Sequence, residues 1–156
     1  MGIVLIISVL LLLIFVKKDQ IRTAFFAFMV AQLFSWPITL LYVQFGLQTN
    51  PVRLFPNATQ SNFLFAFIFH PSVFVVYYMH YPKKVRRLMR ILYTAVIVFF
   101  PIMFQFLTAM LTNLVFFPYK LVVLGSYILI FGLYNISRIY IDRYLLRVHH
   151  PGRNES

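Results

Sequence analysis

Four polar side chains stand out because each lies within a long apolar stretch of the chain. Gln32, Gln44 and Gln105 carry amide groups, and His70 carries an imidazole. A polar group of this kind costs several kcal/mol in apolar surroundings if it has no hydrogen-bond partner. We therefore expect each of them either to bond to a neighbouring helix or to line a polar path.

The types of these residues argue against catalysis. The chain has only three acids (Asp19, Asp142 and Glu155), and none lies within an apolar stretch, which leaves no buried carboxylate for a proton relay. No serine has the G-x-S-x-G context of a nucleophile, and there is no cysteine. The sequence predicts no catalytic residue and no cofactor, and the protein is expected not to be an enzyme.

His70 is the only titratable group expected deep in an apolar stretch. His80 lies ten residues further on, and His149 and His150 lie near the end of the chain, so no two-ligand spacing of a zinc site is present. We expect no metal site. The favoured interpretation is a structural histidine that bonds the carbonyl freed by Pro71, and the alternative is a ligand or a proton sensor.

Cations form one dense cluster and one isolated position. The cluster comprises Lys83, Lys84, Arg86, Arg87 and Arg90. Each could contribute about 1 kcal/mol near an anionic leaflet, although a role in topology alone would also explain the cluster. Arg53 stands alone between Pro51 and Pro56, where it could clamp its loop through carbonyls or receive an anionic partner.

The composition defines the surroundings that these residues need. The 156 residues are 62% hydrophobic and 11% charged, whereas soluble domains are about 45–50% apolar and about 25% charged. Lipid must cover much of this apolar surface. The net charge of +11 does not indicate a nucleic-acid partner, because the cations lie in short segments between apolar runs.

Five apolar runs predict transmembrane helices, each of which needs about 20 residues to cross. They cover residues 2–16, 23–47, 63–81, 91–112 and 121–136. The first run is short for a crossing, so Lys17 and Lys18 are expected to snorkel or the bilayer to thin locally. We predict an all-α polytopic membrane protein, a bundle of five transmembrane helices. Residues 1–148 would form a single domain, and residues 149–156 a disordered cytoplasmic tail.

The distribution of Lys and Arg predicts the orientation. With five crossings, one side collects three cations from residues 17–22, five from 83–90 and four from 138–153, against only Arg53 and Lys120 on the other side. Because such residues in short loops favour the cytoplasm, the N-terminus should be outside and the C-terminus in the cytoplasm.

The second run offers the best surface for helix packing. Small side chains recur at every fourth position, at Thr23, Ala27, Ala31, Ser35 and Thr39. Membrane helices approach closely through such ridges, so this run is expected to be the central one. Gly125 and Gly132 offer a second approach site, and kinks are expected at Pro37, Pro71 and Pro101.

Several short motifs resemble the CBO-type family of small membrane proteins. They are residues 17–22 (KKDQIR), Gln32, Leu33, Phe34 and Trp36, residues 50–55 (NPVRLF), Ala58 and Thr59, and Tyr81 and Pro82. The resemblance implies a bacterial cytoplasmic membrane, in spore-forming Firmicutes, and no assigned activity. Gln44 and Leu54 stand where that family tends to carry acids, so a charged pair with Arg53 is not expected.

Two functions lead, and an enzyme that handles lipid stays a third alternative, for which two titratable groups within hydrogen-bond reach would have to face the headgroups. The first is a non-enzymatic accessory or structural membrane protein that works through helix packing and through lipid or protein partners, with anionic headgroups on the cytoplasmic side. The second is a small oligomeric transport or permeation module with Gln32, Gln44, His70 and Gln105 along a polar path. Convergence of the four side chains on a water-accessible cavity would favour permeation. Hydrogen bonding of each side chain to a neighbouring helix would favour the accessory or structural role.

Overall fold

The computed structural model describes residues 2–49, 63–112 and 120–149. Within those ranges the chain is all-helical and contains no strand. The helices are α1 (Gly2–Phe15), α2 (Ile21–Gln44), α3 (His70–Met79), α4 (Arg87–Leu111) and α5 (Lys120–His149). A 3-10 turn, η1 (Lys18–Gln20), precedes α2, and a π-helix, η2 (Leu64–Phe69), leads directly into α3. The predicted all-α class is confirmed.

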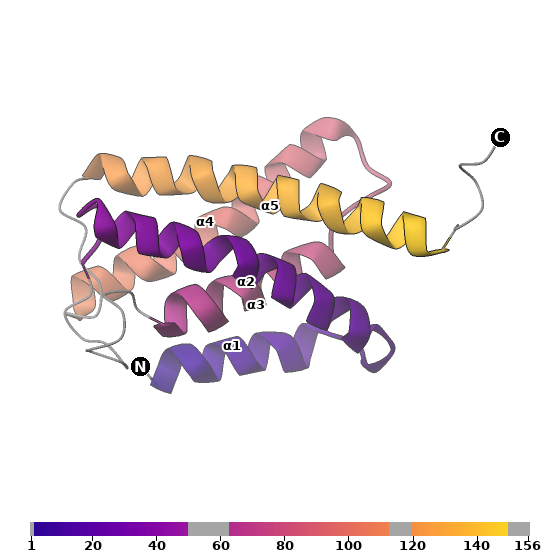
Figure 1. Ribbon diagram of the computed structural model, residues 1–156, viewed down its shortest axis with the longest axis horizontal. Coiled ribbons are helices and arrows are strands. Elements are labelled where there is room, and N and C mark those ends of the chain that lie inside the picture. Colours follow the sequence, from indigo (N-terminus) through magenta and orange to yellow (C-terminus); the bar gives the residue numbers. More distant parts are fainter. Residues whose placement is uncertain (1, 50–62, 113–119, 150–156) are drawn as a thin grey trace.

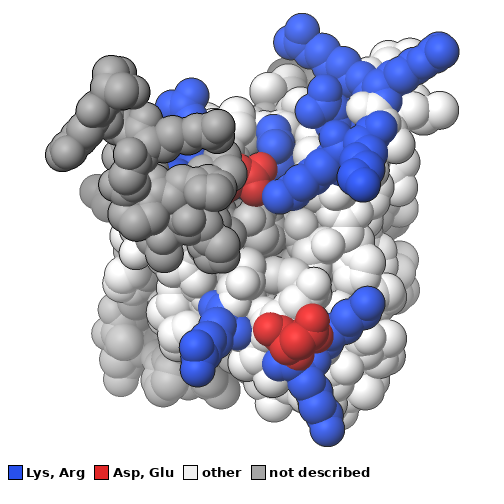
Figure 2. Space-filling model, turned by 90° about the vertical axis from the view of Figure 1, so that its right-hand side faces the viewer, with Lys and Arg blue, Asp and Glu red and all other residues white. Residues whose placement is uncertain are grey.

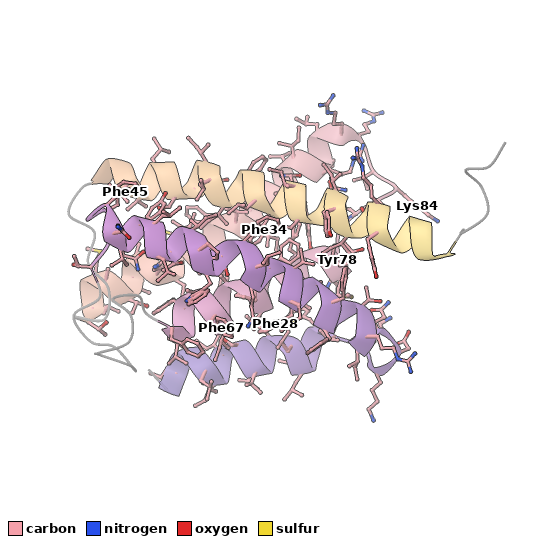
Figure 3. All side chains as sticks on the ribbon, viewed as in Figure 1. Phe28, Phe34, Phe45, Phe67, Tyr78 and Lys84 are labelled. Atoms are coloured by element: carbon pink, nitrogen blue, oxygen red, sulfur yellow. The ribbon has the colours of Figure 1, made fainter. Side chains whose placement is uncertain are left out.

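The helices run back and forth between two ends of one bundle (Figure 1). The turn between α1 and α2 and the segment between α3 and α4 lie at one end. Lys and Arg side chains gather at that end, which Figure 2 views directly. In Figure 3, Lys84 lies at this end and Phe45 at the opposite end. The segments that carry the predicted cytoplasmic cations therefore share one end of the bundle.

Among the described residues, three stretches are long and apolar enough to cross a membrane: Lys18–Gln44, Arg87–Leu111 and Val122–Tyr144. The other two apolar helices are shorter, since α1 has 14 residues and Leu64–Met79 has 16. Many large apolar side chains on the long helices face outward, for example Met110 and Leu111, which are 70% and 73% exposed. Outward apolar side chains in such numbers are typical of a surface covered by lipid.

The most buried helix is α3 rather than the predicted second run. Phe74 and Tyr77 of α3 and Phe69 of η2 are almost completely buried. A helix that is apolar on all sides is stable only when other helices cover it, and α3 is such a helix. The predicted ridge on α2 is nevertheless a contact surface, because Ala27 and Ala31 are buried.

Helix ends differ from the predicted boundaries for local reasons. α2 stops at Gln44 because Gly46 takes a positive φ of 67° and the N–H of Leu47 bonds the carbonyl of Tyr42 at 2.9 Å, which closes the helix. α4 begins at Arg87 rather than at residue 91. α5 continues past residue 136 to His149, so the predicted tail begins with a helical residue, and the rest of it lies outside the described residues.

The two predicted glycine approach sites are not approach sites. A Cβ atom added at Gly125 or at Gly132 would meet nothing within 4 Å. The contacts of α5 instead come from other positions, where Tyr134, Ser137 and Ile141 are buried. The spacing of seven residues does place the two glycines on one side of α5, but no neighbouring helix approaches either of them closely.

Candidate functional site

The site begins at a break in the backbone hydrogen bonding before α3. In η2 the N–H of His70 bonds the carbonyl of Phe65, five residues back. The next residue, Pro71, has no N–H, so the helix is one donor short where the carbonyls of Ala66 and Phe67 need partners. In an apolar setting those carbonyls must be bonded from elsewhere.

α2 supplies a donor to each of these two carbonyls. The Gln32 Nε2 donates to the carbonyl oxygen of Phe67 at 2.8 Å, and the Ser35 Oγ donates to that of Ala66, also at 2.8 Å. Residues three apart lie on the same helix face, so a single face of α2 covers the break. The expectation that His70 would bond the carbonyl freed by Pro71 is therefore wrong, because Gln32 does so.

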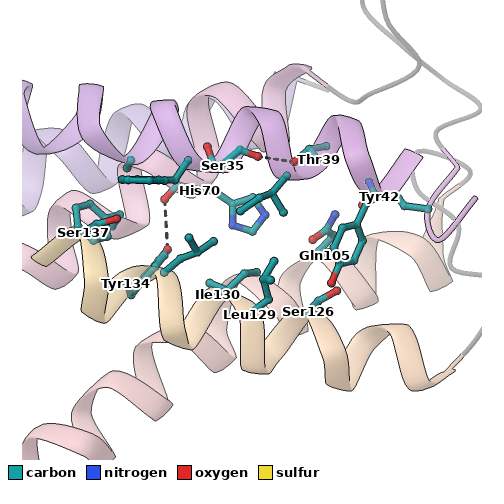
Figure 4. Close-up of a pocket in the computed structure, with 16 residues that line it drawn as sticks. Ser35, Thr39, Tyr42, His70, Gln105, Ser126, Leu129, Ile130, Tyr134 and Ser137 are labelled. Carbon is teal, nitrogen blue, oxygen red and sulfur yellow. Dashed lines mark hydrogen bonds between the residues drawn. The ribbon is translucent and has the colours of Figure 1, made fainter. Parts of the chain in front are cut away.

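α5 contacts the same region from the opposite side. The Tyr134 hydroxyl donates to the carbonyl oxygen of His70 at 3.3 Å (Figure 4). The break before α3 is thus held by side chains from two helices. The His70 imidazole takes no part in these backbone bonds, which leaves the ring available to the space beside it.

That space is a cavity between α2, α3, α4 and α5, with a volume of about 70 Å³. Figure 4 shows the His70 ring directed into it, with Gln105 and Tyr42 on the far side. The Gln105 side chain lies within hydrogen-bonding reach of the imidazole. Further polar groups on the lining come from Thr39, Gln48, Ser126 and Ser137. Among the described residues, no Asp, Glu, Lys or Arg lines this cavity.

The structure therefore divides the four predicted polar residues. His70 and Gln105 line one cavity. Gln32 is capped by η2, and Gln44 is exposed at the end of α2. The four side chains therefore do not converge on this one cavity. Tyr42, Ser126 and Ser137 were missed, although Ser126, Tyr134 and Ser137 follow a helical spacing that marks one face of α5.

The cationic end of the bundle is organised around one acid. Asp142 forms ion pairs with the Nζ of Lys83 at 3.0 Å and with the Nη1 of Arg138 at 3.3 Å. The Tyr78 hydroxyl donates to the same carboxylate at 3.1 Å. The Arg138 guanidinium also lies over the Tyr81 ring, 4.3 Å from its centroid. Asp142 thus joins α5 to the segment that follows α3.

The remaining members of the predicted cationic cluster lie mostly at the surface. Lys84, Arg86 and Arg87 are exposed, and Arg90 is half-buried. The Nε atoms of Arg90 and Arg138 are buried without a hydrogen-bond partner among the described residues. Arg53 lies outside the described residues. The described residues contain no group of three or more potential metal ligands of the His, Cys, Asp or Glu type.

Comparison of the chain with known protein families, with curated proteins and with solved structures finds no match. The class that the fold and composition define is an all-helical protein, and the part of the chain that the structure describes holds three helices long and apolar enough to cross a membrane. The resemblance to the CBO-type family stays a prediction from the sequence motifs.

Proposed function

We propose that this chain is a non-enzymatic membrane protein that crosses the bacterial cytoplasmic membrane five times, with its N-terminus outside and its C-terminus in the cytoplasm. It would serve as an accessory or structural component, acting through helix packing and through lipid or protein partners. The observation that carries this proposal is the common position of the cation-bearing segments at one end of the bundle (Figure 2).

The alternating course of the helices supports five crossings. α1 and the η2–α3 segment run between the same two ends as the three long helices (Figure 1). Their lengths of 14 and 16 residues correspond to about 21 Å and about 24 Å, against a hydrocarbon layer of about 30 Å. Lys17 and Lys18, which follow α1, would snorkel, or the bilayer would thin locally.

The hydrogen bonds at the break before α3 favour the packing role over permeation. Gln32 and Ser35 are both engaged with backbone carbonyls rather than with a path. Towards the cationic end, Tyr77 packs against Phe74 and Tyr81, with ring centroids 5.8 Å and 5.4 Å apart, and Tyr77 is fully buried. This aromatic layer would oppose a continuous polar route.

A small oligomeric permeation module is the second candidate, because His70 and Gln105 do share a cavity. Flux of small solutes through reconstituted vesicles would support it. Recovery of one stoichiometric protein partner from mild detergent would support the accessory role instead. A solitary chain that conducts solutes would overturn that role.

The absence of cysteine makes the topology directly testable. Single substitutions Gly2→Cys, Gln44→Cys and Lys84→Cys would be treated with a membrane-impermeant maleimide in intact and in permeabilised cells. We expect Gly2→Cys and Gln44→Cys to react in intact cells, and Lys84→Cys only after permeabilisation. Reaction of Gln44→Cys and Lys84→Cys from the same side would overturn the proposed topology, and protection of Gly2→Cys alone would remove α1 from the crossings.

A further inference from the structure

We propose that the cavity between α2, α3, α4 and α5 binds an uncharged single-chain lipid whose small head carries hydroxyl or carbonyl groups. The head would lie beside His70 and Gln105, and the acyl chain would leave between α2 and α5. This inference rests on the proposed function, because it requires that lipid surround the bundle.

The lining determines the polarity of the ligand. His70, Gln105 and Tyr42 offer both hydrogen-bond donors and acceptors on the lining of the cavity (Figure 4). Apolar walls come from Phe34, Phe74 and other side chains. Because no ionic side chain among the described residues lines the cavity, a charged head would lie there without a counter-ion, at high cost.

The pattern of burial indicates where the cavity opens. Of the lining residues of α3 and α4, Phe74 and Gln105 are buried, and His70 is half-buried. On α2 and α5 the burial is uneven: Ala31, Tyr134 and Ser137 are buried, whereas Ile38 is half-buried and Leu129 is 38% exposed. The cavity is only partly enclosed, and because Leu129 of α5 is its most exposed lining residue, we place the open side where α5 meets α2. That side would face the acyl chains of the bilayer, from which a lipid can enter sideways.

The small residues of α2 explain why space exists at this position. Ala31, Ser35 and Thr39 belong to the predicted ridge and also line the cavity. Ser35 and Thr39 direct their hydroxyls to backbone carbonyls, at 2.8 Å and 2.9 Å, rather than across the gap. The face of α2 that covers the break before α3 thus leaves room towards α5.

The volume limits the size of the head. A cavity needs about 10–15 Å³ to hold one water molecule. A cavity of about 70 Å³ therefore holds a head group that takes the place of roughly five water molecules. A glycerol or hydroxyl head fits this space, whereas a bulky head would not. We therefore expect a monoacylglycerol or a fatty alcohol rather than a phospholipid.

The test uses the full chain in phosphatidylcholine vesicles with a monoacylglycerol that carries a diazirine near its head and an alkyne on its chain. Light-dependent labelling would be measured, and the labelled peptides identified by mass spectrometry. We expect labels on peptides from α2 and α5 that line the cavity. Unlabelled monoacylglycerol should compete, and the matching lysophosphatidic acid, which carries a charged head, should compete poorly.

Matched variants separate the cavity from the general lipid surface. Leu129→Trp fills the open side, and Ile128→Trp makes the same change at a residue that is 65% exposed and does not line the cavity. Gln105→Leu removes a polar group from the cavity, and Gln44→Leu does so outside it. Leu129→Trp and Gln105→Leu should lower labelling about threefold to tenfold, as expected for loss of about one hydrogen bond or its equivalent. The two controls should not change it.

Equal labelling of Leu129→Trp and Ile128→Trp, or equal competition by the charged lipid, would overturn the proposal. An apolar diazirine reagent that partitions into the bilayer gives the independent readout. If it labels outward residues such as Ile128 while the monoacylglycerol labels nothing in the cavity, the lipid site is wrong and membrane insertion stands. If the apolar reagent also fails to label the outward residues, the chain is not inserted in the bilayer, and the proposed function fails as well.

Discussion

Replacement of Gln32 by leucine tests the hydrogen bonding at the break before α3. Gln32→Leu introduces an apolar side chain of similar size. It removes the amide that donates to the Phe67 carbonyl at 2.8 Å. An unsatisfied buried group costs about 1–3 kcal/mol, whereas hydrogen bonds between membrane helices average about 0.6 kcal/mol. We expect a loss of about 1–2 kcal/mol in the free energy of unfolding, which is above the average for a bond between membrane helices and in the lower part of the range for an unsatisfied group.

The decisive comparison adds Pro71→Ala. Alanine restores an N–H that can bond a carbonyl of the preceding turn, so Gln32→Leu should cost less in that background. A double-mutant cycle, measured by unfolding in mixed micelles of mild detergent and dodecyl sulfate, should give a coupling of about 0.5–1.5 kcal/mol. Gln44→Leu, at an exposed glutamine, is the control and should change stability by less than about 0.5 kcal/mol.

Two results would refute this reasoning. One is a Gln32→Leu cost no larger than that of Gln44→Leu. The other is a Gln32→Leu cost that stays the same with and without Pro71→Ala, because the glutamine would then act independently of the missing N–H. Retained helicity by circular dichroism would show that each variant is folded before its stability is compared.

Three further predictions use the same unfolding assay. Asp142→Asn should cost about 1–2 kcal/mol, less at high salt, because it removes the partner of Lys83 and of Arg138; an equal effect of Asp19→Asn, at an exposed acid, would contradict this. Tyr134→Phe should cost about 0.6 kcal/mol through loss of the bond to the His70 carbonyl, while Tyr140→Phe, at a residue 56% exposed, should cost nothing measurable. Gly132→Leu should leave stability unchanged or raise it, since a Cβ there meets nothing within 4 Å; a large loss would restore the glycine as a packing site.

The helical class follows from the sequence because each apolar run must satisfy its own backbone hydrogen bonds in lipid. The contact face of α2 was also predictable, because small residues at every fourth position mark a close approach, and Ala27 is completely buried. The central position of α3 was not. Its run is shorter than that of α2, and hydropathy alone does not distinguish burial in protein from burial in lipid.

The cavity depended on information that no single run carries. Proline at position 71 predicts a missing donor, but only the packing of α2 on η2 determines that Gln32 and Ser35 replace it. That replacement leaves the His70 ring free to face Gln105, some thirty-five residues further along the chain. The glycines of α5 misled the prediction because their spacing marks a side of the helix without stating what that side meets.

The two bonds from α2 to η2 also have a mechanical consequence. Gln32 and Ser35 donate hydrogen bonds to adjacent carbonyls, those of Phe67 and Ala66. Rotation of α2 about its axis, or its translation by one turn along η2, would break both hydrogen bonds at once. Two carbonyls would then be left without a donor in an apolar medium. α2 and α3 are therefore expected to move as one rigid body. Any opening and closing between helices of the bundle would occur where α5 packs against α2 and α3.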